Sequence, residues 1–289
     1  MGRSLALVGA AVDIQTICSG LNLANDGIWY GRGNAAVSYP ADGHEQCFAV
    51  EDSSFWFRHR NACIVAVASE FPPPGDGAIF DIGGGNGFVS MGLANAGFDV
   101  ALVEPGHVGA VNAKRRGVRN VICATAESAQ FTPHSLSAAG LFDVIEHIDD
   151  APAFLRSVKG LLRPQGYLYA TVPAYQSLWS DEDVSAGHYR RYTMSSLQAT
   201  LDAAGFDLLF ASYIFRFLPV PIFMLRALPH RLGISRGQRM PDAASRDHRV
   251  KQGLASRLLQ GMLDREVELL KRRQSMRFGG SCLVVAKCR

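Results

Sequence analysis

The chain of 289 residues is 48% hydrophobic and 19% charged, which is enough apolar material to bury the core of one large α/β domain. Its formal net charge is +3 and charges of both signs are interspersed, so no basic stripe indicates a nucleic-acid partner, and we predict none. The six cysteines have no C-x-x-C spacing and indicate neither a zinc ribbon nor a disulfide framework. We therefore expect reduced thiols and a cytoplasmic location.

Residues 1–54 form a leader that glycine, asparagine and aspartate interrupt, and we expect it to wrap the core or to close over it. Its apolar start, residues 5–12, is too short to cross a membrane and lacks the cleavage pattern of a signal peptide. From residue 55 to about residue 215, predicted strands and helices alternate. This alternation is typical of an α/β fold with a doubly wound parallel sheet.

A short apolar strand, residues 78–82, breaks into a glycine-rich turn and continues as a helix from Phe88. Glycines allow the backbone to approach a ligand where a Cβ would clash, and the free N–H groups of a helix start favour anionic or polar groups. A dinucleotide site would have a third glycine where Phe88 stands, so we disfavour a nicotinamide-dependent oxidoreductase. The turn predicts contacts to another nucleotide-like cofactor, from Asp81, Gly83, Gly84, Gly85 and Gly87.

Further strands follow at regular spacing. Residues 100–103 form an apolar run that ends at Glu104, where a carboxylate can accept hydrogen bonds from both hydroxyls of a ribose. The third predicted strand covers residues 120–124, the fourth ends near Phe142, and the fifth covers residues 167–172. An acid–histidine pair, Glu146 and His147, follows the fourth strand.

Four segments together resemble one protein family. The spacing D-x-G-x-G-x-G over residues 81–87 resembles motif I of the class I S-adenosylmethionine-dependent methyltransferases. FDVIEHIDD (142–150), LLRPQGYLYATVPAY (161–175) and LWSDEDVSAGHYRRYT (178–193) resemble a bacterial branch of that family. The resemblance covers about residues 55–215 and implies S-adenosylmethionine as cofactor.

The resemblance also implies a complete architecture. We expect a seven-stranded, mostly parallel Rossmann-like sheet in a methyltransferase domain of residues 55–289, preceded by the leader of residues 1–54. Strand six is predicted near residues 208–213. An antiparallel strand seven near residues 281–286 follows a helix over about residues 254–273. The segment between these two strands, residues 216–252, is predicted to be a lid-like insertion.

The cofactor site is implied by the same family pattern. Trp56 and Arg60 are expected beside the methionine end of the cofactor, and Ala126 and Glu127 at the adenine. The remaining cofactor candidates lie at the ends of strands and in the turns after them, namely Asp81, Gly83, Gly84, Gly85, Gly87, Glu104, Pro105, Phe142 and Asp143.

Methyl transfer needs an aligned nucleophile, exclusion of water and, for a hydroxyl, a proton acceptor. His147 is the first candidate for this base, because it follows a strand at the ligand-binding edge and imidazole titrates near neutral pH. A structural role, capping the next helix or pairing with Asp149, is an equal alternative. Glu146 can orient His147, hold a metal or sit at a helix start. Tyr189 is the third catalytic candidate, and we predict no metal.

The acceptor site is expected around the fifth strand and the block after it. Tyr175, Trp179 and His188 are candidate walls of this pocket. Arg190 and Arg191 can clamp a carboxylate or phosphate of the acceptor, or form ion pairs with the acids of residues 181–183. The sequence leaves both roles open.

The apolar first half of the insertion has three interpretations. It can be a lid over a hydrophobic acceptor, ordinary core packing, or a peripheral membrane contact through residues 217–233. Pro219 and Pro221 argue against a regular amphipathic helix there.

We predict methyl transfer to an oxygen atom of a small-molecule or lipid-linked acceptor. The alternatives are cyclisation, aminocarboxypropyl transfer, or a non-catalytic cofactor-binding partner subunit. The oligomeric state stays open.

Overall fold

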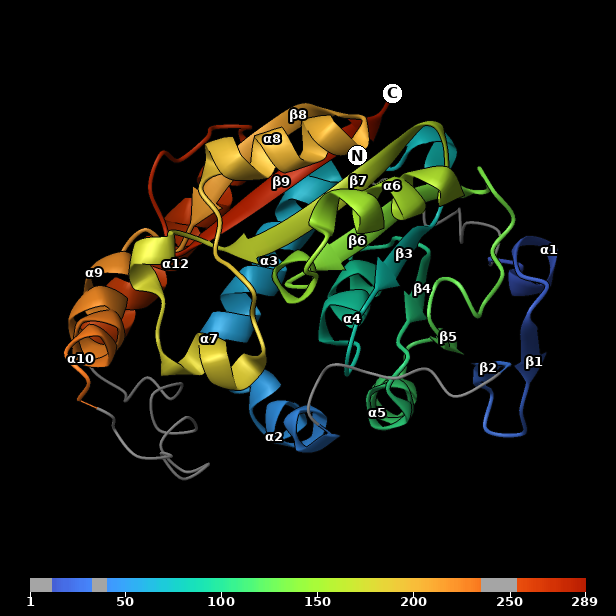
Figure 1. Ribbon diagram of the computed structural model, residues 1–289, viewed down its shortest axis with the longest axis horizontal. Coiled ribbons are helices and arrows are strands. Elements are labelled where there is room, and N and C mark those ends of the chain that lie inside the picture. Colours follow the sequence, from blue (N-terminus) through green and yellow to red (C-terminus); the bar gives the residue numbers. More distant parts are fainter. Residues whose placement is uncertain (1–11, 33–40, 235–253) are drawn as a thin grey trace, which may run out of the picture.

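The computed structural model describes residues 12–32, 41–234 and 254–289 (Figure 1). Residues 1–11 and 33–40 of the leader and 235–252 of the predicted insertion therefore lie outside the described residues. The described strands are β1 (Leu21–Leu23), β2 (Trp29–Gly31), β3 (Ile79–Ile82), β4 (Val100–Val103), β5 (Asn120–Cys123), β6 (Leu136–Phe142), β7 (Leu162–Pro173), β8 (Phe206–Ile214) and β9 (Ser281–Cys288). They form one sheet in the order β1-β2-β5-β4-β3-β6-β7-β9-β8.

The expected sheet is confirmed and is wider than predicted. The strands β3 to β8 are the six predicted from apolar runs, and β9 is the predicted antiparallel strand, which lies between β7 and β8. Two further strands come from the leader: β2 pairs in parallel with β5, and β1 pairs antiparallel with β2. The expectation of seven strands was therefore incomplete, because three-residue strands without an apolar alternation give no signal in the sequence.

Helices cover both faces of the sheet, as a doubly wound fold requires (Figure 1). One apolar core lies under α1 (Ile14–Ile17), α6 (Ala151–Leu161) and α8 (Met194–Ala204). A second lies under α3 (Phe55–Glu70), α4 (Phe88–Asn95) and α12 (Leu254–Lys271). The helix α5 (His107–Arg116) packs on β4 and β5, and α2 (Ala41–Glu51) contacts α5.

Short helices make up most of the remaining connections. These are η1 (Pro74–Asp76), η2 (Ile145–His147), η3 (Gln176–Leu178), α7 (Asp181–Ala186), α9 (Pro219–Ile222), η4 (Phe223–Ala227) and α10 (Leu228–Arg231).

Local capping explains where the helices near the predicted site begin. The side chain of Asp150 accepts a hydrogen bond from the backbone N–H of Ala153 (2.9 Å), so α6 begins directly after the acid–histidine loop. Capping boxes start α7 at Ser180 and α8 at Thr193. These caps hold the loops after β6 and β7 at fixed points on the sheet edge.

The apolar segment after β8 is helical despite its prolines. Pro219 and Pro221 lie in the first turn of α9, where a backbone N–H has no acceptor within the helix. The segment continues through the π-helix η4 into α10 and is therefore not one regular α-helix. The side chains of Val220, Met224 and Leu225 are more than half exposed. No helix of the described ranges is long and apolar enough to cross a membrane.

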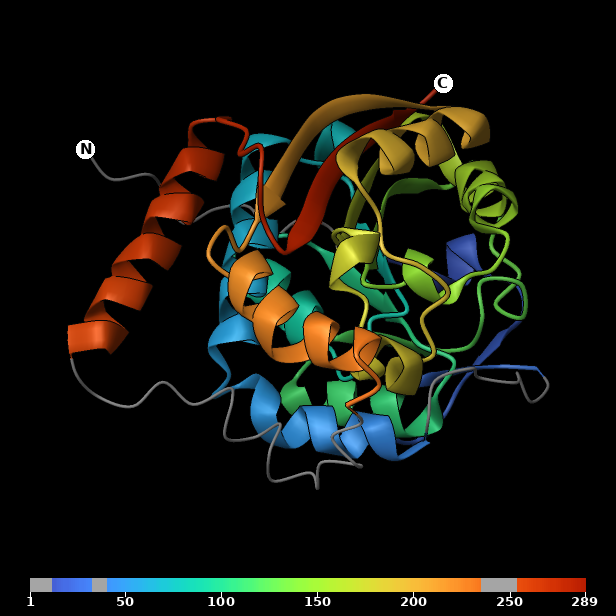
Figure 2. The ribbon, with the colours of Figure 1, turned by 60° about the vertical axis from the view of Figure 1, so that its left-hand side comes forward.

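The C-terminal helix α12 runs beside α3 (Figure 2) and is fixed to it by one buried carboxylate. Oε2 of Glu266 lies 2.9 Å from Nε2 of His59 and accepts the backbone N–H of Phe215 at 2.8 Å. Oε1 accepts the N–H of Arg216 at 2.7 Å. Glu266 is 3% exposed and His59 is 5% exposed, so the pair joins α3, α12 and the end of β8 away from water.

We therefore expect Glu266→Ala to lower the free energy of unfolding by about 3 kcal/mol, because it leaves His59 and two backbone N–H groups without their buried acceptor. Urea unfolding followed by circular dichroism measures this change. Glu268→Ala, which removes an exposed carboxylate paired with Lys271 on the same helix, is the matched control and leaves the midpoint nearly unchanged. Equal midpoints for the two variants would contradict the anchoring role.

Candidate functional site

Three acidic residues gather at the carboxyl edge of the parallel strands. Asp81 lies in β3, Glu104 directly follows β4, and Asp143 directly follows β6. The parallel pairing of β3 with β4 and β6 brings the ends of these strands together. Burial raises the pKa of Asp81 to about 6 and that of Glu104 to about 7. The three sequence-predicted acids are therefore adjacent, and two of them, Asp81 and Glu104, are buried and costly to ionise.

Glu104 joins two turns through its carboxylate. Oε2 accepts the backbone N–H of Gly85 at 2.9 Å, and Oε1 accepts that of Gly106 at 2.6 Å. The imidazole of His44 lies 3.8 Å from Oε1. This carboxylate is consequently fixed between the glycine turn and the start of α5.

The glycines of the turn differ in what surrounds them. An added Cβ would come within 2.8 Å of Val144 at Gly83, of Asp81 at Gly84, and of Ala113 at Gly87. These three glycines are explained by close packing. A Cβ on Gly85 (φ +53°) would instead contact only His44, at 4.0 Å, among the described residues. Gly85 is therefore the glycine that borders space for a ligand.

The leader helix α2 docks on this turn through Asn86. The Nδ2 of Asn86 donates to the carbonyl of His44 at 2.8 Å and to Oε1 of Glu51 at 3.3 Å. Arg116 adds ion pairs with Glu51 (2.8 Å) and Asp52 (2.6 Å). No spacing in the sequence predicts these contacts, and the one signal is the position of Asn86 within the glycine motif.

Arg60 is the cation of the site. Its Nη1 forms an ion pair with Oδ2 of Asp143, whose Oδ1 accepts the hydroxyl of Thr171 at 2.9 Å. The guanidinium group lies 4.7 Å above the ring of Trp56. Arg60 is 9% exposed, and its Nε has no hydrogen-bond partner among the described residues. The predicted residues Trp56, Arg60 and Asp143 thus form one group, whereas Phe142 belongs to the apolar core.

A second group consists of Glu146, His147 and His188, here called the Glu-His-His cluster. Their potential ligand atoms all lie within 4.8 Å of one another, and the two imidazole rings are 4.7 Å apart, edge to face. The backbone N–H of Tyr189 donates to the carbonyl of Glu146 at 2.8 Å, which joins the two segments. Burial, with the charge of Asp143, raises the pKa of Glu146, and burial, with His188, lowers the pKa of His147.

Asp183 fixes the segment that carries His188. Its Oδ1 lies 2.8 Å from Nδ1 of His188 and accepts Nε of Arg191 at 2.8 Å, and its Oδ2 accepts the N–H of Ser180 at 2.9 Å. Burial acts to raise the pKa of Asp183, but the hydrogen bonds from His188 and Arg191 outweigh it and lower the pKa. Arg190 instead reaches Asp149, with its Nη2 3.1 Å from Oδ1. Both predicted arginine clamps therefore have acidic partners within the chain.

The other predicted residues lie around these groups. Tyr175 stacks on Tyr213 with ring centroids 5.2 Å apart, Trp179 is half-buried, and Tyr189 is 56% exposed. Pro105 follows Glu104, and its carbonyl lies 3.9 Å from the thiol of Cys123. Ala126 is half-buried and Glu127 is exposed, in a turn after β5 that the side chains of Thr125 and Ser128 close.

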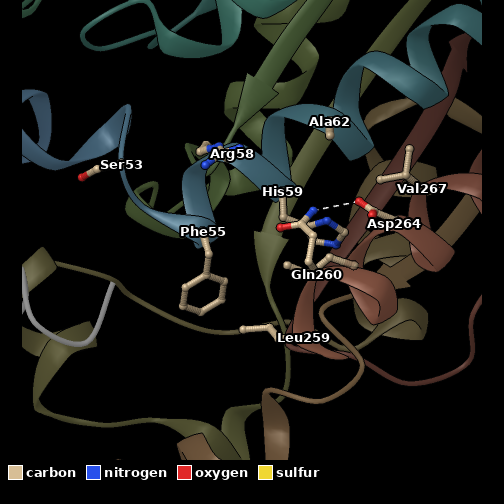
Figure 3. Close-up of a pocket in the computed structure, with 10 residues that line it drawn as sticks. Ser53, Phe55, Arg58, His59, Ala62, Leu259, Gln260, Asp264 and Val267 are labelled. Carbon is tan, nitrogen blue, oxygen red and sulfur yellow. Dashed lines mark hydrogen bonds between the residues drawn. The ribbon is translucent and has the colours of Figure 1, made fainter. Parts of the chain in front are cut away.

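A pocket of about 300 Å³ lies elsewhere, between α3 and α12 (Figure 3). Its lining comes mainly from these two helices and comprises Ser53, Phe55, Arg58, His59, Ala62, Leu259, Gln260, Leu263, Asp264 and Val267. None of these residues belongs to the glycine turn or to the Glu-His-His cluster. The chemistry of the sheet edge, rather than this pocket, therefore defines the candidate site.

The chain matches a known protein family. A family model described as a methyltransferase domain matches residues 56–210, more than half of the chain. No curated protein sequence matches the chain.

Solved structures share the fold at low sequence identity. A S-adenosylmethionine-dependent methyltransferase from Thermotoga maritima is 18% identical with a TM-score of 0.52, over 86% of this chain and 96% of that one. A methyltransferase in complex with the Haloferax volcanii Trm112 activator is 14% identical with a TM-score of 0.52, over 86% and 93%. Phosphoethanolamine N-methyltransferase 2 of Haemonchus contortus, in complex with S-adenosylmethionine, is 18% identical with a TM-score of 0.52, over 87% and 58%. These similarities support the fold alone.

Proposed function

Because the chain belongs to the methyltransferase-domain family and is a class I S-adenosylmethionine-dependent methyltransferase, we propose that it methylates a hydroxyl oxygen of a small-molecule or lipid-linked acceptor. The observation that carries the choice of oxygen is the Glu-His-His cluster. Two of its members follow β6 and the third follows β7, at the edge where open parallel sheets bind ligands. A weakly acidic hydroxyl needs groups of this kind to release its proton.

The residues at the sheet edge fit the cofactor. We assign Glu104 as the acceptor of hydrogen bonds from the ribose hydroxyls. The ribose would occupy the space beside Gly85, where an added Cβ would meet no backbone atom. We assign the carboxylate of the methionine end to Arg60, whose buried Nε lacks a partner among the described residues, with Asp143 and Trp56 holding the guanidinium group. Ala126 and Glu127 are assigned to the adenine from the family pattern. When bound, the cofactor supplies an electrophilic methyl group on a sulfonium.

The chain's own task is to align and deprotonate the acceptor. The negative charge of Asp143 contributes to the raised pKa of Glu146, so the Glu-His-His cluster lies near Asp143. The cluster therefore borders the methionine end of the assigned cofactor site. We assign His147 as the base that takes the proton of the acceptor hydroxyl. The carbonyl of Gly187 orients its ring. Tyr175, Trp179, Tyr189 and the Arg190–Arg191 pair are assigned to the rim of the acceptor site.

We assign the leader, residues 1–54, as a cap on the cofactor and the first part of the insertion 216–252 as a lid on the acceptor. The docking of α2 on Asn86 supports the cap. The lid is supported by contacts to α7, where Arg226 lies 3.4 Å from Glu182 and His230 lies 2.6 Å from Asp181. The exposed side chains of Val220, Met224 and Leu225 favour an acceptor with a lipid tail, or a membrane surface that carries one.

The proposed reaction is tested by product analysis with methyl-labelled S-adenosylmethionine. We expect S-adenosylhomocysteine and a labelled methyl ether when the chain meets phenols and catechols with and without a prenyl tail. Aniline and thiophenol analogues of the same shape are the matched controls and stay unlabelled. Label on nitrogen would overturn the oxygen assignment, methylthioadenosine would indicate non-methylating chemistry, and binding without turnover across the panel would indicate a partner subunit.

Gly85→Ala should reduce affinity for S-adenosylmethionine at least tenfold, because the added methyl group enters the space assigned to the cofactor. The positive φ of +53° adds backbone strain of about 1 kcal/mol. Gly75→Ala is the matched control, since Gly75 has φ +66° and a Cβ there would contact nothing within 4 Å. Calorimetric titration of both variants measures the difference, and equal affinities would refute the cofactor assignment at Gly85.

Affinity for S-adenosylmethionine should weaken as the pH falls below 7. Burial raises the pKa of Glu104 to about 7, so the carboxylate that accepts ribose hydroxyls is protonated at lower pH, and the dissociation constant rises by up to about tenfold per pH unit. The titratable groups that face Glu104 are His44, Asp81 and Cys123. Titrations between pH 5.5 and 7.5 measure the slope.

The variant Glu104→Gln distinguishes the titration of Glu104 from the titration of these neighbouring groups. The amide binds the cofactor more weakly but does not titrate, so its affinity should be nearly independent of pH over this range. A slope that persists in this variant would assign the titration to another group.

A further inference from the structure

We propose that the Glu-His-His cluster binds one divalent transition-metal ion, with Zn²⁺ or Mn²⁺ as the expected class, which holds the oxygen of the acceptor. Two imidazoles and one carboxylate form a ligand set that catalytic metal sites use while keeping a coordination position open. The proposal rests on the function proposed above. It names a site that the family match does not assign.

The donor atoms are already close together. One atom from each of Glu146, His147 and His188 lies within 4.8 Å of the other two. A tetrahedral ion bound at about 2.0–2.2 Å brings such atoms to roughly 3.4 Å of one another. Small side-chain rotations can bring the donor atoms from 4.8 Å to this separation, because the backbone hydrogen bond from Tyr189 to Glu146 already fixes the two segments.

One carboxylate oxygen of Glu146 lacks a partner in the part of the chain that the structure describes. Its side chain is 1% exposed, and its Oε2 has no hydrogen-bond partner among the described residues. A buried carboxylate oxygen without a partner is costly, and native structures rarely tolerate one without a reason. A cation between Glu146 and the two imidazoles provides that reason.

Each histidine is oriented as metal ligands are. Nδ1 of His188 lies 2.8 Å from Asp183, a carboxylate that is itself held by Ser180 and Arg191. The ring of His147 is hydrogen-bonded to the carbonyl of Gly187. In His188, Nδ1 contacts a carboxylate oxygen, which leaves Nε2 for a ligand. Such carboxylate–histidine pairs fix the ring orientation and strengthen the metal bond.

The expectation of no metal rested on a single acid–histidine pair. His188 adds the third donor, from a segment that follows a different strand. The spacing in the sequence does not connect these segments.

The ion would act on the acceptor. A hydroxyl bound to a divalent ion loses its proton more readily, as metal-bound water does. The acceptor proton passes to solvent, the oxygen–methyl bond forms as the methyl–sulfur bond breaks, and the neutral thioether S-adenosylhomocysteine leaves. With the ion bound, His147 is a ligand and takes no proton, so this scheme replaces the base role assigned to it above.

The test uses the full chain without a histidine tag, stripped with a chelator and titrated with Co²⁺ as the spectroscopic probe. We expect one ion per chain and the visible absorption of a Co²⁺ ion with nitrogen ligands in a low-coordinate site. Zn²⁺ should displace it with the same stoichiometry.

Variants identify the ligands. Glu146→Gln and His188→Ala should each weaken Co²⁺ binding at least 100-fold and alter the spectrum. His134→Ala is the matched control, because His134 contacts the carbonyl of Leu162 away from the cluster, and its Co²⁺ binding should equal that of the parent. Glu146→Gln preserves the shape of a buried side chain whose Oε2 already lacks a partner among the described residues, so its thermal midpoint without metal should equal or exceed that of the parent. This keeps the test valid if His188→Ala unfolds.

Two results would overturn the metal site: no stoichiometric Co²⁺ binding, or equal binding by the parent and Glu146→Gln. The proposed function is tested separately. Methyl ether formation that is insensitive to chelator would leave that function standing without the metal, whereas stoichiometric Co²⁺ binding without methyl transfer to oxygen would retain the metal site and reject the oxygen assignment.

Discussion

The candidate site depends on one buried cation among several carboxylates. Parallel strands deliver Asp81, Glu104 and Asp143 to the same edge, where like charges repel each other in a medium of low polarity. Arg60 pairs with Asp143, and its charge also acts to lower the pKa of Asp81 against the effect of burial. Since Arg60 comes from α3, the geometry of the edge depends on how α3 packs. The His59–Glu266 pair one residue away fixes that packing.

Most polar groups of the edge have partners, which makes the exceptions informative. Glu104 is held by two backbone N–H groups, and Asp81 accepts the hydroxyl of Ser90 at 2.7 Å. The buried atoms of this edge without a hydrogen-bond partner among the described residues include Nε of Arg60 and Oε2 of Glu146. One is a donor and the other an acceptor. They correspond to the two ligand positions that we assign, an anionic group of the cofactor and a cation beside the acceptor.

The sequence predicted local features well and long-range contacts poorly. Apolar runs broken by glycine located β3 and β4, and motif spacing identified Asp81 and Glu104, because strand ends and turns depend on neighbouring residues. The pairing of β2 with β5 depends on residues about ninety positions apart, and three-residue strands leave no periodic pattern. The meeting of His188 with Glu146 depends on Asp183 folding α7 back onto the loop after β6, which no spacing rule encodes. The prediction of Arg60 and Trp56 as site residues came from family resemblance rather than from periodicity.

The position of α2 also has a kinetic consequence. His44 lies over Glu104 and beside Gly85, so the leader helix covers the space that we assign to the ribose. A cofactor cannot diffuse directly into a covered site, and α2 must first move away from Asn86. Binding then becomes gated: the observed association rate saturates at the opening rate of the helix as cofactor concentration rises. The same gate retains the spent cofactor, so release of the product would need the same opening of α2.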